Sequence, residues 1–440
     1  MSKLALLGGR AVIDRPLEPY SSIGVEEIEA VDRVMRTGVL SKFVGAWCED
    51  FFGGPAVREL EASWSEKFNV KHSITVNSAT SGIFAALGAI GVGPGDEVIV
   101  PPYTMSATAM APLIYGAIPV FVDIEPDTFC LDPAKVLEQI TTKTKAILVV
   151  NLFGHPAQLQ RLRAIADEHH IKLIEDNAQG PLALEQGRYA GAIGHIGIFS
   201  LNYHKHIQTG EGGVCVTDDD DLAKRLQMIR NHGENVTEQL GVQDITNLVG
   251  YNYRMTELSA AVGIEQLKKA ESLVARREEI SSYLSEVVGS LRGLTAPAVR
   301  ANCRHVYYVW AMRYDEKVIG ISRELFCRAL AAEGFPNSAG YVAPLYRLPV
   351  FQRRIAIGSS GFPFNLSDRR YNDGMCPVVE RMHEQELIEF HVCSYQINNV
   401  QMEKLGEALQ KVCANVSDLK NLDEEPNSVK EVIGKGSSQH

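Results

Sequence analysis

The stretch FSLNYHKHIQTGEGG, residues 199–213, is the most informative segment of the sequence. It follows an apolar segment and leads into the apolar residues 214–216. A lone lysine is usually a solvated surface residue, but Lys205 lies between a predicted strand and a glycine-rich turn, a poor place for a merely solubilising charge. An amine held among aromatic and polar side chains can have its pKa lowered enough to attack an aldehyde and later to carry a proton. Lys205 is therefore a candidate nucleophile and proton carrier.

Two histidines, His204 and His206, flank this lysine. Either one could instead be the working base or a metal ligand. In extended chain, however, alternating residues point to different faces, and the pair lacks the i, i+4 spacing usual for metal-binding histidines on a helix. Lys205 is the preferred candidate, and the histidines stay as alternatives.

Apolar, β-branched segments alternate with helical patterns on both sides of this stretch. Such alternation is typical of a mostly parallel sheet covered by helices on both faces. The expected strands are 72–77, 97–100, 118–122, 146–152, 172–175, 197–201 and 213–217. The expected helices are 80–90, 106–115, 133–140, 157–169 and 222–230. Together they predict a large α/β domain.

A longer apolar periodicity, from about 256 to 287, predicts a helix that can bridge two domains. Beyond it, a strand and two helices indicate a smaller α+β domain, and we expect them at 306–313, 322–333 and 400–412.

We expect three parts: an arm plus large domain (1–285), a small domain (286–416) and a disordered tail (417–440). The tail is rich in Asp, Glu, Lys, Ser and Asn, which cannot bury enough apolar surface to fold.

Composition excludes several classes of function. The chain has 43 basic and 54 acidic residues and a net charge of −11, which disfavours a nucleic-acid partner. No apolar segment reaches the roughly 18 residues needed to cross a membrane, and the start lacks a signal-peptide pattern, so we expect a cytoplasmic protein. The 8 cysteines have no metal-ligand spacing, so we expect reduced thiols and no metal site.

Two polar clusters follow predicted strands, where ligands of doubly wound sheets bind. In the segment 77–82, small residues open a helix whose free N–H groups can hold a phosphate, although taken alone the segment is better explained by ordinary capping by Ser78 or Thr80. Asp176 follows an apolar strand, and a buried carboxylate there needs a cation such as a protonated pyridine nitrogen. A helix cap or turn residue is the alternative for Asp176.

These clusters, in this order, resemble the DegT/DnrJ/EryC1/StrS family of sugar and cyclitol aminotransferases, from Leu4 to about Val412. The matching blocks are GGPAVRELE (53–61), NSATSG (77–82), GDEVIVP (95–101), EDNAQ (175–179), the run 200–213 and GYNYRM (250–255). The resemblance implies the type I aminotransferase fold, pyridoxal 5'-phosphate as cofactor, and a homodimer in which the neighbouring chain completes each active site.

The resemblance also assigns residues to the cofactor. At the ring it places Lys205 as the Schiff-base lysine, Asp176 as the partner of the pyridine nitrogen and Gln179 near the ring hydroxyl. At the phosphate it places Ala79, Thr80 and Ser200, with Asn252 reaching over from the other subunit.

The sequence departs from the family pattern in two places. Family members usually stack an aromatic residue on the ring two positions beyond Tyr103, but this chain has Met105 there, so either Tyr103 or Met105 is expected to cover the ring. The segment 41–52, with Phe43 and Trp47, resembles an insertion that is a substrate flap or a dimer contact.

The resemblance implies that an amino group moves from glutamate or glutamine to a ketone on a sugar or cyclitol. Relatives that remove a sugar hydroxyl carry His in place of the lysine; counting back six positions from Glu211 gives Lys205, which favours transamination over dehydration. A non-catalytic regulatory protein and a dinucleotide-dependent oxidoreductase are further alternatives. A regulatory protein has no reason to keep the cofactor residues together, and no Gly-rich dinucleotide fingerprint follows the first strand.

The ketone itself is expected to be a keto-cyclitol rather than a nucleotide-linked sugar. The segments 344–351 and 376–381 resemble the cyclitol and aminobenzoate branches. A nucleotide-linked sugar would need cations for its diphosphate, and Arg347, Arg353 and Arg354 are candidates unless they form an exposed basic loop.

Overall fold

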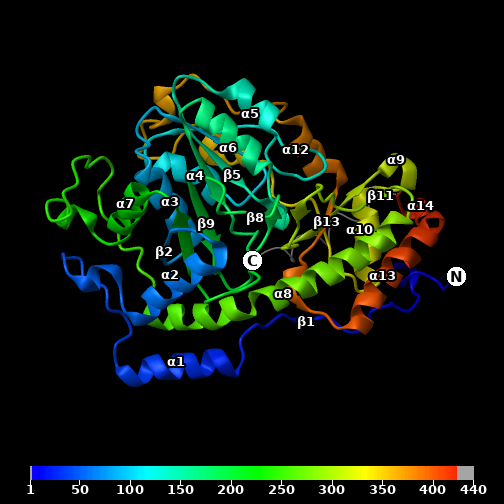
Figure 1. Cartoon of the computed structure of the whole chain (residues 1–440). Helices are drawn as coiled ribbons and strands as arrows, with labels where there is room; N and C mark the ends of the chain where they lie inside the picture. Colours follow the sequence, from blue (N-terminus) through cyan, green and yellow to red (C-terminus); the bar gives the residue numbers. More distant parts are fainter. Residues whose placement is uncertain (1, 424–440) are drawn as a thin grey trace.

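The predicted apolar strands pair into one central sheet in the larger of two lobes (Figure 1). The structure, a computed structural model, describes residues 2–423. The strands are β2 (His72–Val76), β3 (Glu97–Val100), β4 (Ile118–Phe121), β5 (Thr144–Val150), β6 (Lys172–Asp176), β9 (Ile196–Ser200) and β10 (Gly213–Thr217). Their order is β2-β10-β9-β6-β5-β3-β4, and only the pairings of β10 are antiparallel. The predicted α/β fold with a mostly parallel sheet is confirmed.

Helices pack around this sheet. They are α2 (Pro55–Phe68), α3 (Ala79–Ala89), α4 (Ala107–Ile114), α5 (Pro133–Gln139), α6 (Leu159–Glu168) and α7 (Asp220–Arg230). Helix α3 contacts α4, α7 and the strands β2, β9 and β10, whereas α6 contacts α5 and the strands β5 and β6. The side chains of Ser78, Asp132 and Asp219 accept hydrogen bonds from first-turn amides and so cap α3, α5 and α7.

Helix α1 (Val25–Thr37) was not among the expected helices, and it contacts α8 (Glu257–Gly289). Only Glu27 and Ala30 of α1 are buried, so its apolar stripe is too narrow to give a clear helical signal. Figure 1 shows α1 standing apart from the rest of the large lobe, alongside α8.

The predicted bridging helix is α8, which begins after the N-cap Thr256. Its side chains up to Val274 belong to the core of the large lobe, and those from Ile280 to Val288 belong to a second core. One helix therefore joins the two lobes, as Figure 1 shows.

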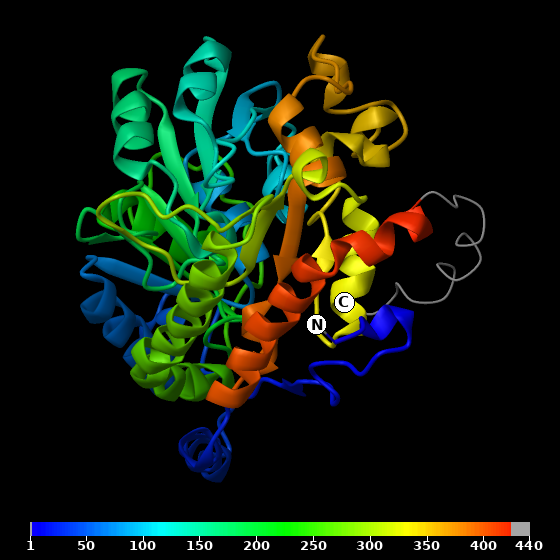
Figure 2. The ribbon, with the colours of Figure 1, turned by 90° about the vertical axis from the view of Figure 1, so that its right-hand side faces the viewer.

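The small lobe contains an antiparallel sheet in the order β11 (Leu294–Thr295), β13 (Trp310–Tyr314), β15 (Leu387–Phe390) and β14 (Ser338–Ala339). Its main helices are α10 (Arg323–Ala332) and α13 (Asn399–Ala414), and α13 lies beside α8 (Figure 2). The shorter elements are β1 (Glu18–Pro19), β7 (Leu184–Glu185), β8 (Arg188–Tyr189), β12 (Cys303–Arg304), β16 (Tyr395–Gln396), α9 (Glu316–Ile319), α11 (Pro349–Gln352), α12 (Pro377–Arg381) and α14 (Lys420–Asp423).

Each of the two hydrophobic cores contains residues from outside the range expected for its domain. Leu4, Ile13 and Leu17 of the N-terminal arm pack in the core of the small lobe, where the backbone N–H of Ala5 donates to Glu333 Oε1 at 2.8 Å. The segment 341–382 instead returns to the large lobe, where its aromatic side chains pack against Phe121.

Part of the expected disordered tail is ordered. Residues 416–423 are helical, and Leu419 is buried in the core of the small lobe, because one apolar side chain reaches that core despite the polar composition around it. Residues 424–440 of that tail lie outside the described part of the chain. Within residues 2–423 no helix is both long enough and apolar enough to cross a membrane, and all eight cysteines are unpaired.

Candidate active site

A cavity of about 230 Å³ opens where strands β2, β6 and β9 end and the stretch 199–213 turns back toward β10. It brings together seven of the residues predicted for the cofactor site: Ala79, Thr80, Met105, Asp176, Gln179, Ser200 and Lys205. These residues are up to 126 positions apart in the chain, so the ends of the strands assemble the site.

Lys205 is buried in the turn after β9, where its backbone N–H donates to Asn202 O at 3.0 Å. Its Nζ lies 4.1 Å from the centroid of the Tyr308 ring. Burial lowers the pKa of Lys205 to about 8, and the nearby Asp176 carboxylate opposes that shift. About a tenth of an amine with this pKa is neutral at pH 7, far more than for a surface lysine, and the neutral form is the nucleophile.

Asp176 is buried at the end of β6. One of its oxygens accepts from the backbone N–H of Ala178, and the other accepts from Thr108 Oγ1, both at 3.1 Å. Burial raises the pKa of this carboxyl, while these hydrogen bonds and the charge of Lys205 favour its ionised form. A buried carboxylate of this kind is stable only opposite a cation.

The turn between β2 and α3 presents backbone N–H groups to the cavity. Ser78 caps α3 by accepting from the N–H of Ser81 at 3.0 Å, which confirms one of the two capping alternatives. The cap leaves the first N–H groups of the helix, at Ala79 and Thr80, available to an anion. Because a Cβ at Gly213 would lie 2.8 Å from Ala79 N, only glycine lets β10 pass this close to the turn.

Gln179 is fixed by hydrogen bonds at both ends of its amide. Its Oε1 accepts from the N–H of Phe153 at 2.7 Å, and its Nε2 donates to the hydroxyl of Tyr341 at 3.2 Å. Tyr341 follows β14 and packs against the core of the large lobe, so this contact fixes the start of the returning segment at the edge of the cavity.

Two predicted cofactor residues do not line this cavity. Tyr103 is fully buried, and its hydroxyl accepts from the backbone N–H of Tyr341 at 2.9 Å, so Tyr103 supports Tyr341 while Met105 is the one at the cavity wall. Asn252 is exposed, and its Oδ1 accepts from Arg254 Nε at 2.8 Å, outside the cavity of its own chain.

The two histidines beside Lys205 have different surroundings. His204 lines the cavity, whereas His206 is fully buried with Nε2 2.8 Å from Val306 O. Burial lowers the pKa of His206 to about 3, so this ring is neutral and its Nε2–H donates to the carbonyl. The segment forms turns rather than the extended chain considered for it, and the two histidine ring centroids lie 6.1 and 6.2 Å from that of Tyr308.

Sequence reasoning missed Tyr308, Tyr341 and Thr108, which line the cavity or bond to Asp176. Tyr308 lies inside the predicted strand 306–313, where a tyrosine among apolar residues and a second tyrosine carries no functional signal. Tyr341 reaches the cavity only because the segment that it begins packs back against the large lobe.

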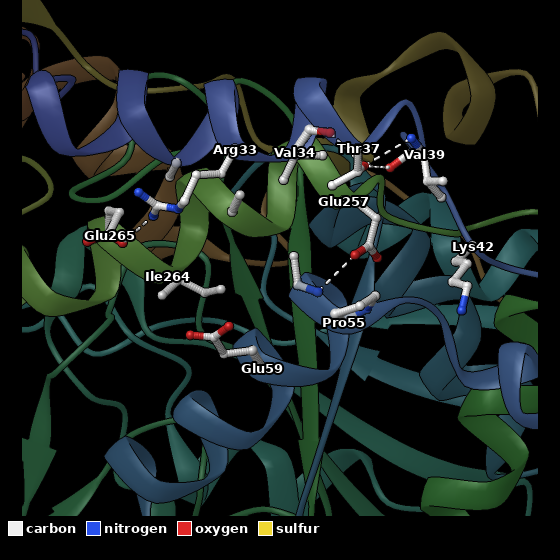
Figure 3. A pocket seen from close by; sticks show the side chains of 13 residues that line it. Arg33, Val34, Thr37, Val39, Lys42, Pro55, Glu59, Glu257, Ile264 and Glu265 are labelled. Carbon is white, nitrogen blue, oxygen red and sulfur yellow. Dashed lines mark hydrogen bonds and ion pairs between the residues drawn. The ribbon is translucent and has the colours of Figure 1, made fainter.

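A second pocket of about 380 Å³ lies between α1, α2 and α8 (Figure 3). It contains none of the predicted site residues. Its buried carboxylate, Glu257, accepts from the backbone N–H of Ala56 at 2.8 Å and occupies the first turn of α8. Glu257 therefore stabilises the N-termini of two helices, which is a structural role.

Comparisons with known proteins identify the family of this chain. The family described as "DegT/DnrJ/EryC1/StrS aminotransferase family" matches residues 22–389. An L-glutamine:2-deoxy-scyllo-inosose aminotransferase from Streptoalloteichus tenebrarius is 33% identical over 436 residues, covering 95% of this chain and 99% of that protein.

Two solved structures share the fold over nearly their whole length. DesI, determined in the presence of its TDP-sugar product, has a TM-score of 0.79 at 27% identity and covers 96% of this chain and 99% of its own. The E. coli GDP-4-keto-6-deoxy-D-mannose-3-dehydratase with bound hydrated PLP has a TM-score of 0.74 at 25% identity, covering 90% of this chain and 99% of its own.

Proposed function

The chain belongs to the DegT/DnrJ/EryC1/StrS aminotransferase family, and from that premise we propose how its residues carry out the reaction. It is a pyridoxal-phosphate-dependent aminotransferase with the type I fold that acts on sugars or cyclitols. The observation that carries the proposal is a buried Lys205 and a buried Asp176 facing one cavity beside a helix N-terminus.

The side chains present fit this cofactor. The cavity offers an amine for its aldehyde, a carboxylate for its ring nitrogen and helix N–H groups for its phosphate. In addition, Asn202 Oδ1 is buried with no hydrogen-bond partner, and an acceptor in this state is stabilised when a ligand supplies a donor. We assign the ring to Lys205, Asp176 and Gln179, and the phosphate to Ala79, Thr80 and Ser200.

When bound, pyridoxal phosphate supplies an aldehyde carbon and a ring that withdraws electrons from the carbon bonded to the amino group. The hydrogen bonds from Ala178 and Thr108 favour the ionised form of Asp176, which would then keep the ring nitrogen protonated. Lys205 would hold the cofactor through its amine. Once an amino acid has displaced it, the freed amine would move the proton from the substrate α-carbon to the cofactor carbon that carried the aldehyde.

Transamination is proposed over dehydration because a lysine occupies position 205. Relatives with the same fold that remove a sugar hydroxyl carry His at this position and work without the amine. His206 does not replace it, since the neutral ring already donates to Val306 O.

For the acceptor we propose a keto-cyclitol. The arginines that could hold a diphosphate are largely occupied by the protein itself: Arg347 pairs with Asp373 and Glu384, both at 2.7 Å, and Arg354 donates to backbone carbonyls. A cation already neutralised by carboxylates attracts a diphosphate only weakly. The 33% identity to a scyllo-inosose aminotransferase across 95% of the chain also favours a cyclitol.

We also propose a homodimer with shared active sites. Large apolar side chains are exposed along α1 and the segment after it: Val25, Ile28, Met35, Val39, Leu40, Val44 and Trp47. Contiguous apolar surface of this kind is typical of an interface. The insertion 41–52 is anchored by Asn231 Nδ2, which donates to Val44 O at 3.0 Å, and Asn231 forms a β-bridge with Asn252. The insertion therefore lies beside the residue expected to reach the neighbour's phosphate.

A cytoplasmic location remains a prediction, and the eight unpaired thiols fit it.

The donor is proposed to be glutamine or glutamate. The purified protein should be assayed with each donor against a panel of keto-cyclitols and nucleotide-linked keto-sugars. We expect amination of keto-cyclitols. Turnover confined to nucleotide-linked compounds would refute the proposed acceptor and leave the aminotransferase assignment intact.

A further inference from the structure

Tyr308 lies against every member of the run His204-Lys205-His206. Its ring centroid is 4.1 Å from Lys205 Nζ, and it is 6.1 and 6.2 Å from the ring centroids of His204 and His206. The reaction proposed above gives this ring no role, although its contact with the lysine is the shortest of the three.

The backbone around Tyr308 holds the ring in place. The N–H of Tyr308 donates to Phe153 O at 2.8 Å, and the N–H of Val306 donates to Gly154 O at 3.0 Å. His206 donates to Val306 O at 2.8 Å from the other side. The ring is only 6% exposed, so water does not solvate the face beneath Lys205.

We propose that the face of the Tyr308 ring holds the amine of Lys205 in position whenever that amine is not bonded to the cofactor, which makes Tyr308 a positioning residue for proton transfer. The inference rests on the proposed role of Lys205. An aromatic face attracts an ammonium group, most strongly where water is excluded. Unlike a carboxylate, the ring carries no full charge, so it stabilises the ammonium form without locking the lysine into an ion pair.

Several other groups act on the same amine. Asp176 on β6 favours the ammonium form, burial disfavours it, and Cys393, which follows β15, also lies close to Lys205. Tyr341, Tyr203, His391 and the buried Glu389 also lie near Tyr308. All of these groups remain when only residue 308 is changed, so a comparison of variants at that position isolates the ring.

The test uses full-length protein loaded with pyridoxamine phosphate, a form in which no bond joins the cofactor to Lys205. Acetic anhydride labels only a neutral amine, and mass spectrometry of the Lys205 peptide then gives the pH of half-maximal labelling. Tyr308→Leu should lower that pH by about one unit, a tenfold change in the protonation equilibrium, and should lower kcat more than it changes KM for the donor. Tyr308→Phe, which keeps the ring, should stay close to wild type.

A series of phenylalanine analogues at position 308, with increasing numbers of fluorine atoms on the ring, gives a second test that does not depend on the folding of the leucine variant. Each fluorine weakens the negative charge on the face of the ring and changes the size of the side chain little. The half-labelling pH should fall stepwise with each fluorine. A flat response across the series, or equal shifts in the Phe and Leu variants, would overturn the proposal. Borohydride reduction of each variant loaded with pyridoxal phosphate tests the premise separately, since a pyridoxyl group on another lysine would refute the role of Lys205 itself.

Discussion

At the scale of single residues, Lys205 illustrates how burial produces reactivity. The same amine on the surface would be almost fully protonated at neutral pH, but desolvation brings its pKa to about 8. The turn from Asn202 to Gly213 produces this burial, because it places the lysine against the ring of Tyr308 and near Asp176 at the exit of β6.

Replacing Lys205 by alanine is therefore expected to remove both the covalent attachment of the cofactor and turnover. Borohydride reduction followed by peptide mapping should find a pyridoxyl group on Lys205 in the wild type and none in the variant. Lys143→Ala, at an exposed position, is the control and should behave like wild type. A pyridoxyl group on a different lysine of the wild type would contradict the assignment.

Asp176→Asn is expected to bind cofactor but to lose kcat by on the order of 10²-fold or more, because a neutral partner no longer keeps the ring nitrogen protonated. Cofactor binding can be followed by absorbance and kcat by steady-state assay. Thr108→Val removes only one hydrogen bond to the carboxylate and should cost less. Near-normal turnover in Asp176→Asn would show that this residue is only a turn residue.

At the scale of elements, the phosphate site depends on how closely β10 passes the first turn of α3. Ser78 caps the helix, and the N–H groups that follow it are free to bind because Gly213 has no side chain to cover them.

Gly213→Ala is expected to weaken cofactor binding, because the new Cβ would lie within 2.8 Å of the backbone at Ser78 and Ala79. Overpacking of this kind typically costs about 1–3 kcal/mol. Titration with pyridoxal phosphate should show a higher Kd in this variant. Gly289→Ala, which has open space around it, should leave the Kd unchanged, and an unchanged Kd in Gly213→Ala would show that β10 has room to shift.

At the scale of the whole molecule, the exposed apolar side chains of α1 and the position of Asn252 favour association with a second copy of the chain. Asn252 lies outside the cavity of its own chain, next to the anchored insertion 41–52. A second copy would cover the apolar surface and could receive Asn252 at its cofactor phosphate.

We expect sedimentation analysis to find a homodimer at assay concentrations. Asn252→Ala should still dimerise but bind pyridoxal phosphate more weakly, whereas Trp47→Ser should weaken the dimer, because the substitution removes apolar area that a partner would bury. An active monomer at working concentrations would rule out shared sites.

The spacing of apolar residues was enough to predict the α/β fold and the bridging helix. Local patterns, namely a strand exit, a capped turn and a glycine-rich reversal, also marked Lys205, Asp176 and the segment 77–82, whereas Met105, Gln179 and Ser200 were expected only from the resemblance to the family. The folded structure was needed to see that Met105 rather than Tyr103 reaches the cavity wall, that the N-terminal arm packs on the small lobe, and that Tyr308 and Tyr341 line the site. These features depend on contacts between segments more than 100 residues apart in the chain, and no local pattern encodes which face of a residue such contacts will bury.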